Sequence, residues 1–189
     1  MKTYIALFRG INVGGNNVLP MKELRSLLEN LGSRNVKTYI QSGNVVFEHG
    51  EEDASLLSNR IGAAIKKSYG FEPRVLLLEL GDIEKAVGSN PFPEAESEPK
   101  TLHVHFLSSV PKDPDLDALE RIKGDRERFV LKDAFFYLHA PDGIGRSKLA
   151  AKAEELLGVA MTGRNWRTVC KIMAMAKQRG EQPSTGSPD

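Results

Sequence analysis

The order of secondary-structure patterns in the first 80 residues most constrains the fold of this chain. The run "TYIALFR" at residues 3–9 is apolar on both faces, as is typical of a strand that is covered on both sides. A helical pattern follows between Pro20 and Gly32, and then the β-rich hairpin "VKTYIQSGNVVFE". Asp53 can cap a second helix that ends at Gly70, before the strand "PRVLLLEL". The order βαββαβ predicts a ferredoxin-like unit, in which two helices cover one face of a four-stranded antiparallel sheet.

The second half offers a similar order without detectable sequence repetition. The strand "TLHVHFL" precedes a helical pattern around residues 116–122, the strands "RFVLKD" and "AFFYLHA", and a helix over residues 147–157. A final helix is predicted from about Gly163 to Gln178, with Thr162 as its N-cap. We therefore predict an α+β fold, a two-layer sandwich of tandem ferredoxin-like (βαββαβ) halves with antiparallel sheets. The predicted boundaries are 1–80 for the first half, 81–100 for a connecting helix and linker, 101–179 for the second half and 180–189 for a disordered tail.

Charge and cysteine content limit the classes of function. The 26 basic and 25 acidic residues give a net charge of +1, so there is no global attraction to nucleic acid or to an anionic membrane. A single cysteine, Cys170, excludes an internal disulfide and cysteine-rich metal sites, which fits a reducing compartment. No apolar run approaches the roughly 20 residues of a membrane span. We expect a cytoplasmic protein with no membrane partner.

The loop "RGINVGGNN" at residues 9–17 is the first candidate for a binding site. Its glycines allow positive φ and close approach to a ligand, its asparagines offer donors and acceptors, and Arg9 adds a fixed charge. The spacing fits neither the dinucleotide fingerprint nor a Walker loop. Such a loop could wrap an anion or could simply be a tight connection from strand to helix, and the sequence leaves both interpretations open.

A second glycine-rich turn, "PDGIGRSKL" at residues 141–149, leads into a helix. Arg146 and Lys148 lie at the start of that helix, where the helix dipole favours anions and two cations are unfavourable. An anionic group bound there would relieve the conflict. The alternative is that both side chains simply extend into water.

Basic charge is concentrated towards the C-terminus. Between residues 143 and 180, eight basic residues stand against two acidic ones, Glu154 and Glu155. The basic residues are Arg146, Lys148, Lys152, Arg164, Arg167, Lys171, Lys177 and Arg179. A solvated helix face is the commonest reason for such a run, and binding of phosphate groups or nucleic acid is the alternative.

Other patterns give weaker indications. The hairpin tip carries Gln41, Ser42 and Asn44, which turn chemistry alone can explain. His103 and His105 share one face of a strand, but no carboxylate spacing supports a metal site there, and we predict none. No nucleophile–base or paired-carboxylate arrangement is recognisable, so the sequence leaves open whether the protein is an enzyme.

Four separated motifs, "ALFRGINVGG", "TYIQSGNVVF", "GIGRSKL" and "TGRNWRTVCKI", resemble the bacterial domain-of-unknown-function family 1697. The resemblance extends from residue 3 to about residue 177 and implies an α+β fold of two ferredoxin-like halves. It implies no reaction, because none is assigned to this family. The positions that match are Arg9, Gly10, Asn12, Gly14, Gly15, Gln41, Ser42, Gly43, Asn44, Gly143, Gly145, Arg146, Ser147, Lys148, Arg164, Asn165, Trp166 and Thr168, while Phe8 stands where an aliphatic residue is expected.

The polar motifs of the two halves together predict one functional site. If these loops and helix N-termini face each other, they form a cleft suited to an anionic small molecule, most plausibly a phosphate-bearing one such as a nucleotide. The predicted ligand-binding residues are Arg9, Asn12, Gly14, Gly15, Gln41, Ser42, Asn44, Arg146, Ser147, Lys148, Arg164 and Asn165. The alternatives are single-stranded RNA binding through the basic C-terminal region and a protein–protein interaction module. The sequence identifies neither a cofactor nor an oligomeric state.

Overall fold

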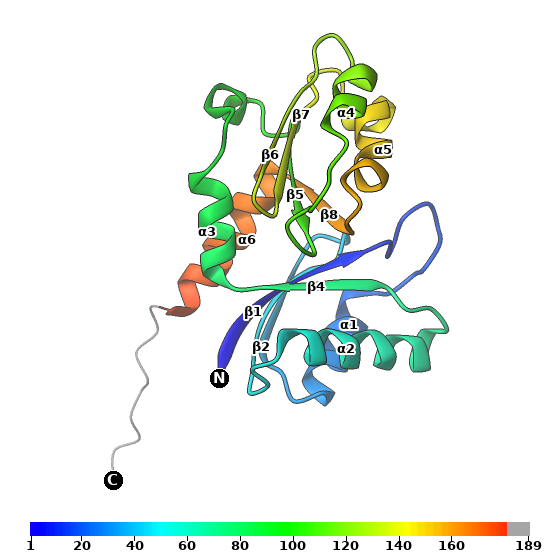
Figure 1. Cartoon of the computed structure of the whole chain (residues 1–189). Helices are drawn as coiled ribbons and strands as arrows, with labels where there is room; N and C mark the ends of the chain where they lie inside the picture. The colour runs from blue at the N-terminus through cyan, green and yellow to red at the C-terminus, as the bar shows by residue number, and fades with distance from the viewer. Residues whose placement is uncertain (181–189) are drawn as a thin grey trace. The chain divides into compact units, whose positions relative to one another are not determined.

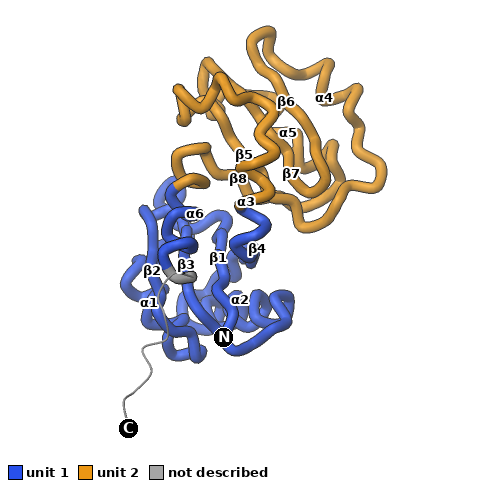
Figure 2. The backbone as a smooth tube through the Cα atoms, turned by 90° about the vertical axis from the view of Figure 1, so that its left-hand side faces the viewer, with its two compact units in different colours: residues 1–83, 171–189 blue, residues 84–170 orange. Residues whose placement is uncertain are grey.

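The computed structural model describes residues 1–180 and divides the chain into two compact units. Unit 1 comprises residues 1–83 and the described residues from Lys171 onward, and unit 2 comprises residues 84–170 (Figure 2). Apart from Gly180, the disordered tail predicted for residues 180–189 lies outside the described residues.

Unit 1 contains a four-stranded sheet in the order β2-β3-β1-β4, in which every neighbouring pair is antiparallel (Figure 1). Its elements are β1 (Lys2–Arg9), α1 (Met21–Asn30), β2 (Arg34–Tyr39), β3 (Asn44–His49), α2 (Ala54–Tyr69) and β4 (Arg74–Leu78). This is the predicted βαββαβ order, and the strand order is that of a ferredoxin-like unit. The fold prediction for the first half is therefore confirmed.

Both faces of the central strand β1 are buried, as its continuous apolar run predicted. Tyr4 pairs with Phe47 and Ala6 with Val45 on the face that contacts α1 and α2. On the other face, Ile5 and Leu7 are fully buried as well. Two-sided burial explains why this strand lacks the alternation of polar and apolar residues found in half-exposed strands.

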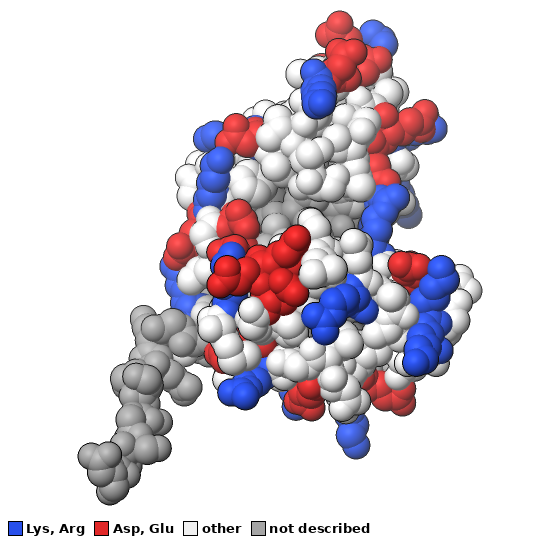
Figure 3. Space-filling model, turned by 60° about the horizontal axis from the view of Figure 1, so that its bottom comes forward, with Lys and Arg blue, Asp and Glu red and all other residues white. Residues whose placement is uncertain are grey.

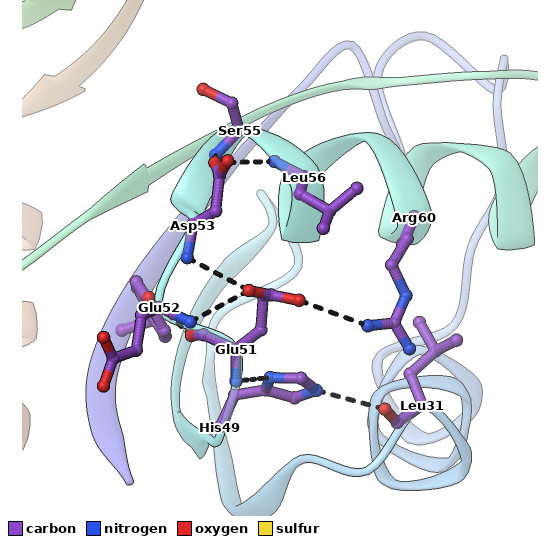
Figure 4. Close-up of polar contacts among 9 residues, drawn as sticks. Leu31, His49, Glu51, Glu52, Asp53, Ser55, Leu56 and Arg60 are labelled. Atoms are coloured by element: carbon purple, nitrogen blue, oxygen red, sulfur yellow. Dashed lines mark hydrogen bonds and ion pairs between the residues drawn. The ribbon is translucent and has the colours of Figure 1, made fainter.

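The segment between β3 and α2 is fixed by a chain of polar contacts (Figure 4). The buried His49 accepts a hydrogen bond at Nδ1 from the Glu51 N–H (2.8 Å) and donates from Nε2 to the Leu31 carbonyl (3.1 Å). The Glu51 carboxylate in turn accepts from the Asp53 N–H (3.2 Å). Asp53 caps α2 as predicted, because Oδ1 accepts from the Leu56 N–H (3.0 Å). These contacts join the end of α1 to the start of α2.

Unit 2 repeats the topology with a sheet in the order β6-β7-β5-β8. Its elements are β5 (Leu102–Leu107), α4 (Leu116–Ile122), β6 (Arg128–Lys132), β7 (Phe135–His139), a 3-10 turn (Ile144–Arg146), α5 (Lys148–Leu157) and β8 (Met161–Asn165), preceded by α3 (Leu80–Gly88) and a 3-10 helix (Pro93–Ser97) and followed by α6 (Trp166–Gly180). Helices α4 and α5 pack on one sheet face, against Phe136 and Leu138. The two sheets confirm the tandem ferredoxin-like prediction.

The start of the final helix was predicted wrongly. Residues 161–165 form strand β8, and α6 begins at Trp166 rather than near Gly163. Thr162 is therefore not the N-cap, and the Asn165 side chain instead accepts from the Thr168 N–H (2.9 Å). The β5–β8 pairing places Gly163 against the His105 ring, where a Cβ would lie 2.5 Å from Cδ2. A glycine is needed for this close approach.

Candidate functional site

The glycine and asparagine residues of the loop after β1 are explained first by its backbone. Five of its residues have positive φ, which glycine adopts freely and asparagine tolerates better than other residues. They are Gly10 (78°), Asn12 (55°), Gly14 (58°), Gly15 (78°) and Asn17 (50°). Val13 and Asn16 form an isolated bridge in the loop that follows β1 (Figure 1). Residues 13–16 therefore form a tight turn, here called the finger, with Gly14 and Gly15 at its tip.

Asn12 holds this loop in place through its whole side-chain amide. Its Nδ2 donates to the carbonyls of Leu19 and Gln41, both at 2.9 Å, and its Oδ1 accepts from the Leu19 N–H at 2.8 Å. The contact with Gln41 joins the loop to the β2–β3 hairpin tip. The polar atoms of Asn12, a predicted ligand-binding residue, are therefore engaged by the protein's own backbone.

The hairpin tip lies directly against the end of β1. The Phe8 N–H donates to the Gly43 carbonyl (2.8 Å), and a Cβ on Gly43 would lie 2.6 Å from Phe8 Cβ. The buried Asn44 donates from Nδ2 to the Tyr39 carbonyl (3.1 Å) and to Ser42 Oγ (2.9 Å). The structure thus brings together two of the predicted motifs, although their asparagine amides serve the fold.

The exposed residues of these motifs lie around that junction. Arg9 ends β1 directly opposite Arg74 of β4, and both side chains are exposed. Gln41 and Ser42 are exposed at the hairpin tip, and Gly14 and Gly15 at the tip of the finger. These residues belong to unit 1, and the single cleft predicted to combine them with residues of the second half stays a prediction.

Unit 2 has its own candidate site, an open groove of about 700 Å³ at the start of α5. It lies between the α4–β6 turn and the β7–α5 loop. Its lining residues are Arg121, Ile122, Lys123, Gly124, Asp125, Arg126, Glu127, Asp142, Gly143, Arg146, Ser147 and Lys148. A volume of this size is typical of small-molecule sites. The groove contains Arg146, Ser147 and Lys148, which the sequence predicted.

The groove holds an excess of positive charge. Arg126 pairs with Asp142 (2.6 Å) and Lys123 with Glu120 (2.6 Å). Arg121, Arg146 and Lys148, by contrast, have no carboxylate within ion-pair distance among residues 1–180. Five basic residues thus line the groove against three acidic ones, and three of the five have no ion-pair partner among residues 1–180.

The first turn of α5 adds to the attraction for an anion. Ser147 is the N-cap, because its Oγ accepts from the Ala150 N–H (2.9 Å). The first amides of a helix have no acceptor within it, and the positive end of the helix dipole lies there. Arg146 and Lys148 flank this position, so an anion in the groove would meet fixed charges and backbone dipole together.

Three basic residues of the groove were not singled out in the sequence. Arg121, Lys123 and Arg126 belong to the run "RIKGDRER" at residues 121–128, which alternates basic and acidic side chains around a glycine turn. A basic run next to a turn was the available signal. The run holds four basic and two acidic residues, an excess of two that is smaller than the excess of six between residues 143 and 180.

Arg164 and Asn165 do not line this groove. Arg164 of β8 pairs with Val104, on the sheet face opposite α4 and α5, and its Nη1 donates to the Gly163 carbonyl (2.8 Å). Burial lowers the pKa of the Arg164 guanidinium to about 10, so the side chain stays charged at neutral pH. Asn165 is occupied as the cap of α6.

The sheet face that binds RNA in RNA-recognition motifs is covered in unit 2. Phe106, Phe135 and Tyr137 lie on neighbouring strands of that face, and all three are buried. The Tyr137 hydroxyl donates to the carbonyl of Ala86 in α3 (2.7 Å), and Lys85 Nζ lies 5.9 Å from the Phe135 ring centre. Bases stack on exposed aromatic rings in such motifs, so this face offers no stacking platform.

The histidines do not assemble a metal site within the described part of the chain, where no group of three His, Cys, Asp or Glu side chains is placed to hold an ion. His103 is buried on the face that α4 and α5 cover, and its Nδ1 has no hydrogen-bond partner. Burial lowers the pKa of His103, so its ring is favoured in the neutral form.

Basic and acidic side chains are interspersed among uncharged ones on the face shown in Figure 3. That face offers no extended basic track for a nucleic-acid backbone. None of the helices within residues 1–180 combines the length and apolar character needed to cross a membrane.

The fold and these sites define an α+β protein of two ferredoxin-like units with polar loops at the ends of the strands. The family described as "Protein of unknown function (DUF1697)" matches residues 1–137, and the chain belongs to this family. The predicted resemblance is thus confirmed, although the motifs at residues 143–149 and 162–172 lie beyond the matched residues.

Among solved structures, the chain is similar to "conserved bacterial protein SP0830 from Streptococcus pneumoniae". The two share 30% sequence identity with a TM-score of 0.64, over 92% of this chain and 98% of that chain. No curated protein matches the chain.

Proposed function

We propose that the protein binds a small anionic ligand that carries phosphate, in the groove at the start of α5. One observation carries the proposal: Arg121, Arg146 and Lys148 converge on this groove without ion-pair partners among residues 1–180. Like charges gathered at the positive end of a helix are unfavourable until an anion binds between them. Arginine forks and backbone N–H groups together suit the oxygen atoms of a phosphate.

A thermal-shift titration with orthophosphate and pyrophosphate tests the proposal. Ligand at 100 times its Kd stabilises a protein by about 2.7 kcal/mol, which corresponds to roughly 5–10 °C for a chain of this length. The Arg146→Ala/Lys148→Ala double variant should lose most of this shift. Each charged hydrogen bond is worth about 1.5–3 kcal/mol, and the double variant removes at least two of them. The affinity of the double variant for phosphate should therefore fall by roughly 100-fold or more.

Lys152→Ala is the matched control, since Lys152 lies on the same helix, pairs with Glu155 and does not line the groove. The control should bind as the unmodified protein does. The proposal is wrong if no phosphate-bearing compound stabilises the unmodified protein, or if the double variant and the control respond alike. A strongly salt-dependent shift with single-stranded RNA alone would favour the alternative of RNA binding through the basic C-terminal region.

A further inference from the structure

The groove at the start of α5 carries carboxylates as well as cations. Asp125, Glu127 and Asp142 line it beside the basic residues. Glu127 is engaged, because its carboxylate accepts from the Gly124 N–H (2.7 Å). Asp142 pairs with Arg126 at 2.6 Å, and 69% of each of these two side chains is exposed. An ion pair so exposed to water contributes little and costs little to open.

An opened Arg126–Asp142 pair provides two complementary groups side by side. The guanidinium donates to phosphate oxygens, and the carboxylate accepts hydrogen bonds from hydroxyl groups. A simple phosphate ion would bind the Arg126 guanidinium, but its negative charge would then lie close to the negative charge of Asp142. A ligand with hydroxyl groups near its phosphate would use both.

The groove offers no aromatic ring on which a base could stack. Among its lining residues, all of which the structure describes, Ile122 has the only apolar side chain and none is aromatic. Bases stack mainly on aromatic rings; they can also stack on arginine planes, but the arginines of this groove are the groups that bind phosphate in the proposal. The groove volume of about 700 Å³ nevertheless exceeds what one phosphate needs.

We propose that the ligand class is a phosphomonoester of a polyhydroxylated carbon skeleton, as in a sugar phosphate. This inference rests on the proposed function. The phosphate lies between Arg146, Lys148 and the first turn of α5, and the hydroxyl groups donate to Asp142. A nucleobase adds nothing to the binding.

Calorimetric titrations with ribose 5-phosphate, orthophosphate, ribose and AMP test this assignment. A hydrogen bond to a charged group is worth at least about tenfold in affinity, so ribose 5-phosphate should bind roughly tenfold or more tightly than orthophosphate. AMP, which carries a base on the same phosphorylated sugar, should bind no more tightly than ribose 5-phosphate. Ribose alone should bind weakly.

Asp142→Asn separates the ligand class from anion binding itself. The variant should retain orthophosphate binding while its preference for ribose 5-phosphate falls below about threefold, since a neutral amide is a weaker acceptor than a carboxylate. Asp117→Asn on α4, outside the groove, is the matched control and should keep the full preference. Equal binding of orthophosphate and ribose 5-phosphate by the unmodified protein, or markedly tighter binding of AMP, overturns the inference and leaves the anion site intact. If none of the phosphates binds, the proposed function itself fails.

Discussion

Replacing Gly43 with alanine should destabilise unit 1 strongly, because two separate penalties apply at this residue. The backbone has a φ of +74°, where a Cβ costs about 1–2 kcal/mol. The added methyl group would also lie 2.6 Å from Phe8 Cβ and 2.8 Å from Ile11 Cδ1, and forcing a methyl into packed surroundings costs about 1–3 kcal/mol. The sum is roughly 2–5 kcal/mol, or a Tm lower by about 5–15 °C.

Gly14→Ala is the control that separates the two penalties. Gly14 has a φ of +58°, but a Cβ there would meet nothing within 4 Å. Only the backbone cost of about 1–2 kcal/mol should remain. Gly43→Ala should therefore unfold at a lower denaturant concentration than Gly14→Ala, by about 1–3 kcal/mol in free energy.

The assay is urea unfolding followed by far-UV circular dichroism, which reports on both units. The chain has one tryptophan, Trp166, which lies in unit 2 at the start of α6, so its fluorescence reports on that part of the chain rather than on the hairpin tip. The loss of stability in Gly43→Ala should therefore appear as a lower urea midpoint of the circular-dichroism transition. If the two alanine variants are equally stable, the close approach of the hairpin tip to β1 is not as tight as the structure has it.

Two further predictions concern stability. Asn12→Ala removes three hydrogen bonds and should lower the free energy of unfolding by about 2–4 kcal/mol in the same urea assay, whereas Asn16→Ala at the exposed finger should change it by less than about 0.5 kcal/mol. Burial lowers the pKa of His103 from 6.5, so the stability linked to this residue is complete above about pH 6.5 and is lost as the pH falls. The urea midpoint should therefore drop less between pH 7.5 and pH 5.5 in His103→Gln, and an identical drop in both proteins would contradict the assignment.

The regular elements were predictable because local chemistry and tertiary packing agree there. Asp53 as a cap, Gly70 as a helix end and the two-sided apolar run of β1 all read correctly from the sequence. Strand β8 was missed because "MTGRN" is short and mostly polar, and its second residue, Thr162, is a good helix-capping residue. Its strand conformation comes from pairing with β5, which local sequence does not reveal.

The polar residues show a different limit. The side chains of Asn12, Asn44 and Asn165 were predicted to bind a ligand, yet each bonds to a backbone group of the protein. An asparagine that supports a turn and one that binds a ligand look alike in a sequence, because both follow glycine-rich segments. The sequence drew attention to "GIGRSKL", which supplies one wall of the groove in unit 2, but not to the α4–β6 turn, which supplies the other, and ligand binding by either stays a prediction.

Helix α6 belongs to both units: Trp166–Cys170 falls in unit 2, and the helix from Lys171 onward falls in unit 1. Unit 1 is therefore discontinuous along the chain and is finished by a segment that is translated after all of unit 2. A nascent chain that has reached residue 83 carries every strand of the first sheet but lacks Ile172 and Ala176, which are buried in the finished protein. All of unit 2 is translated before the first unit can close. Completion of unit 1 during synthesis thus waits until α6 has been translated, and a chain that ended before Trp166 would lack the part of α6 that belongs to each unit.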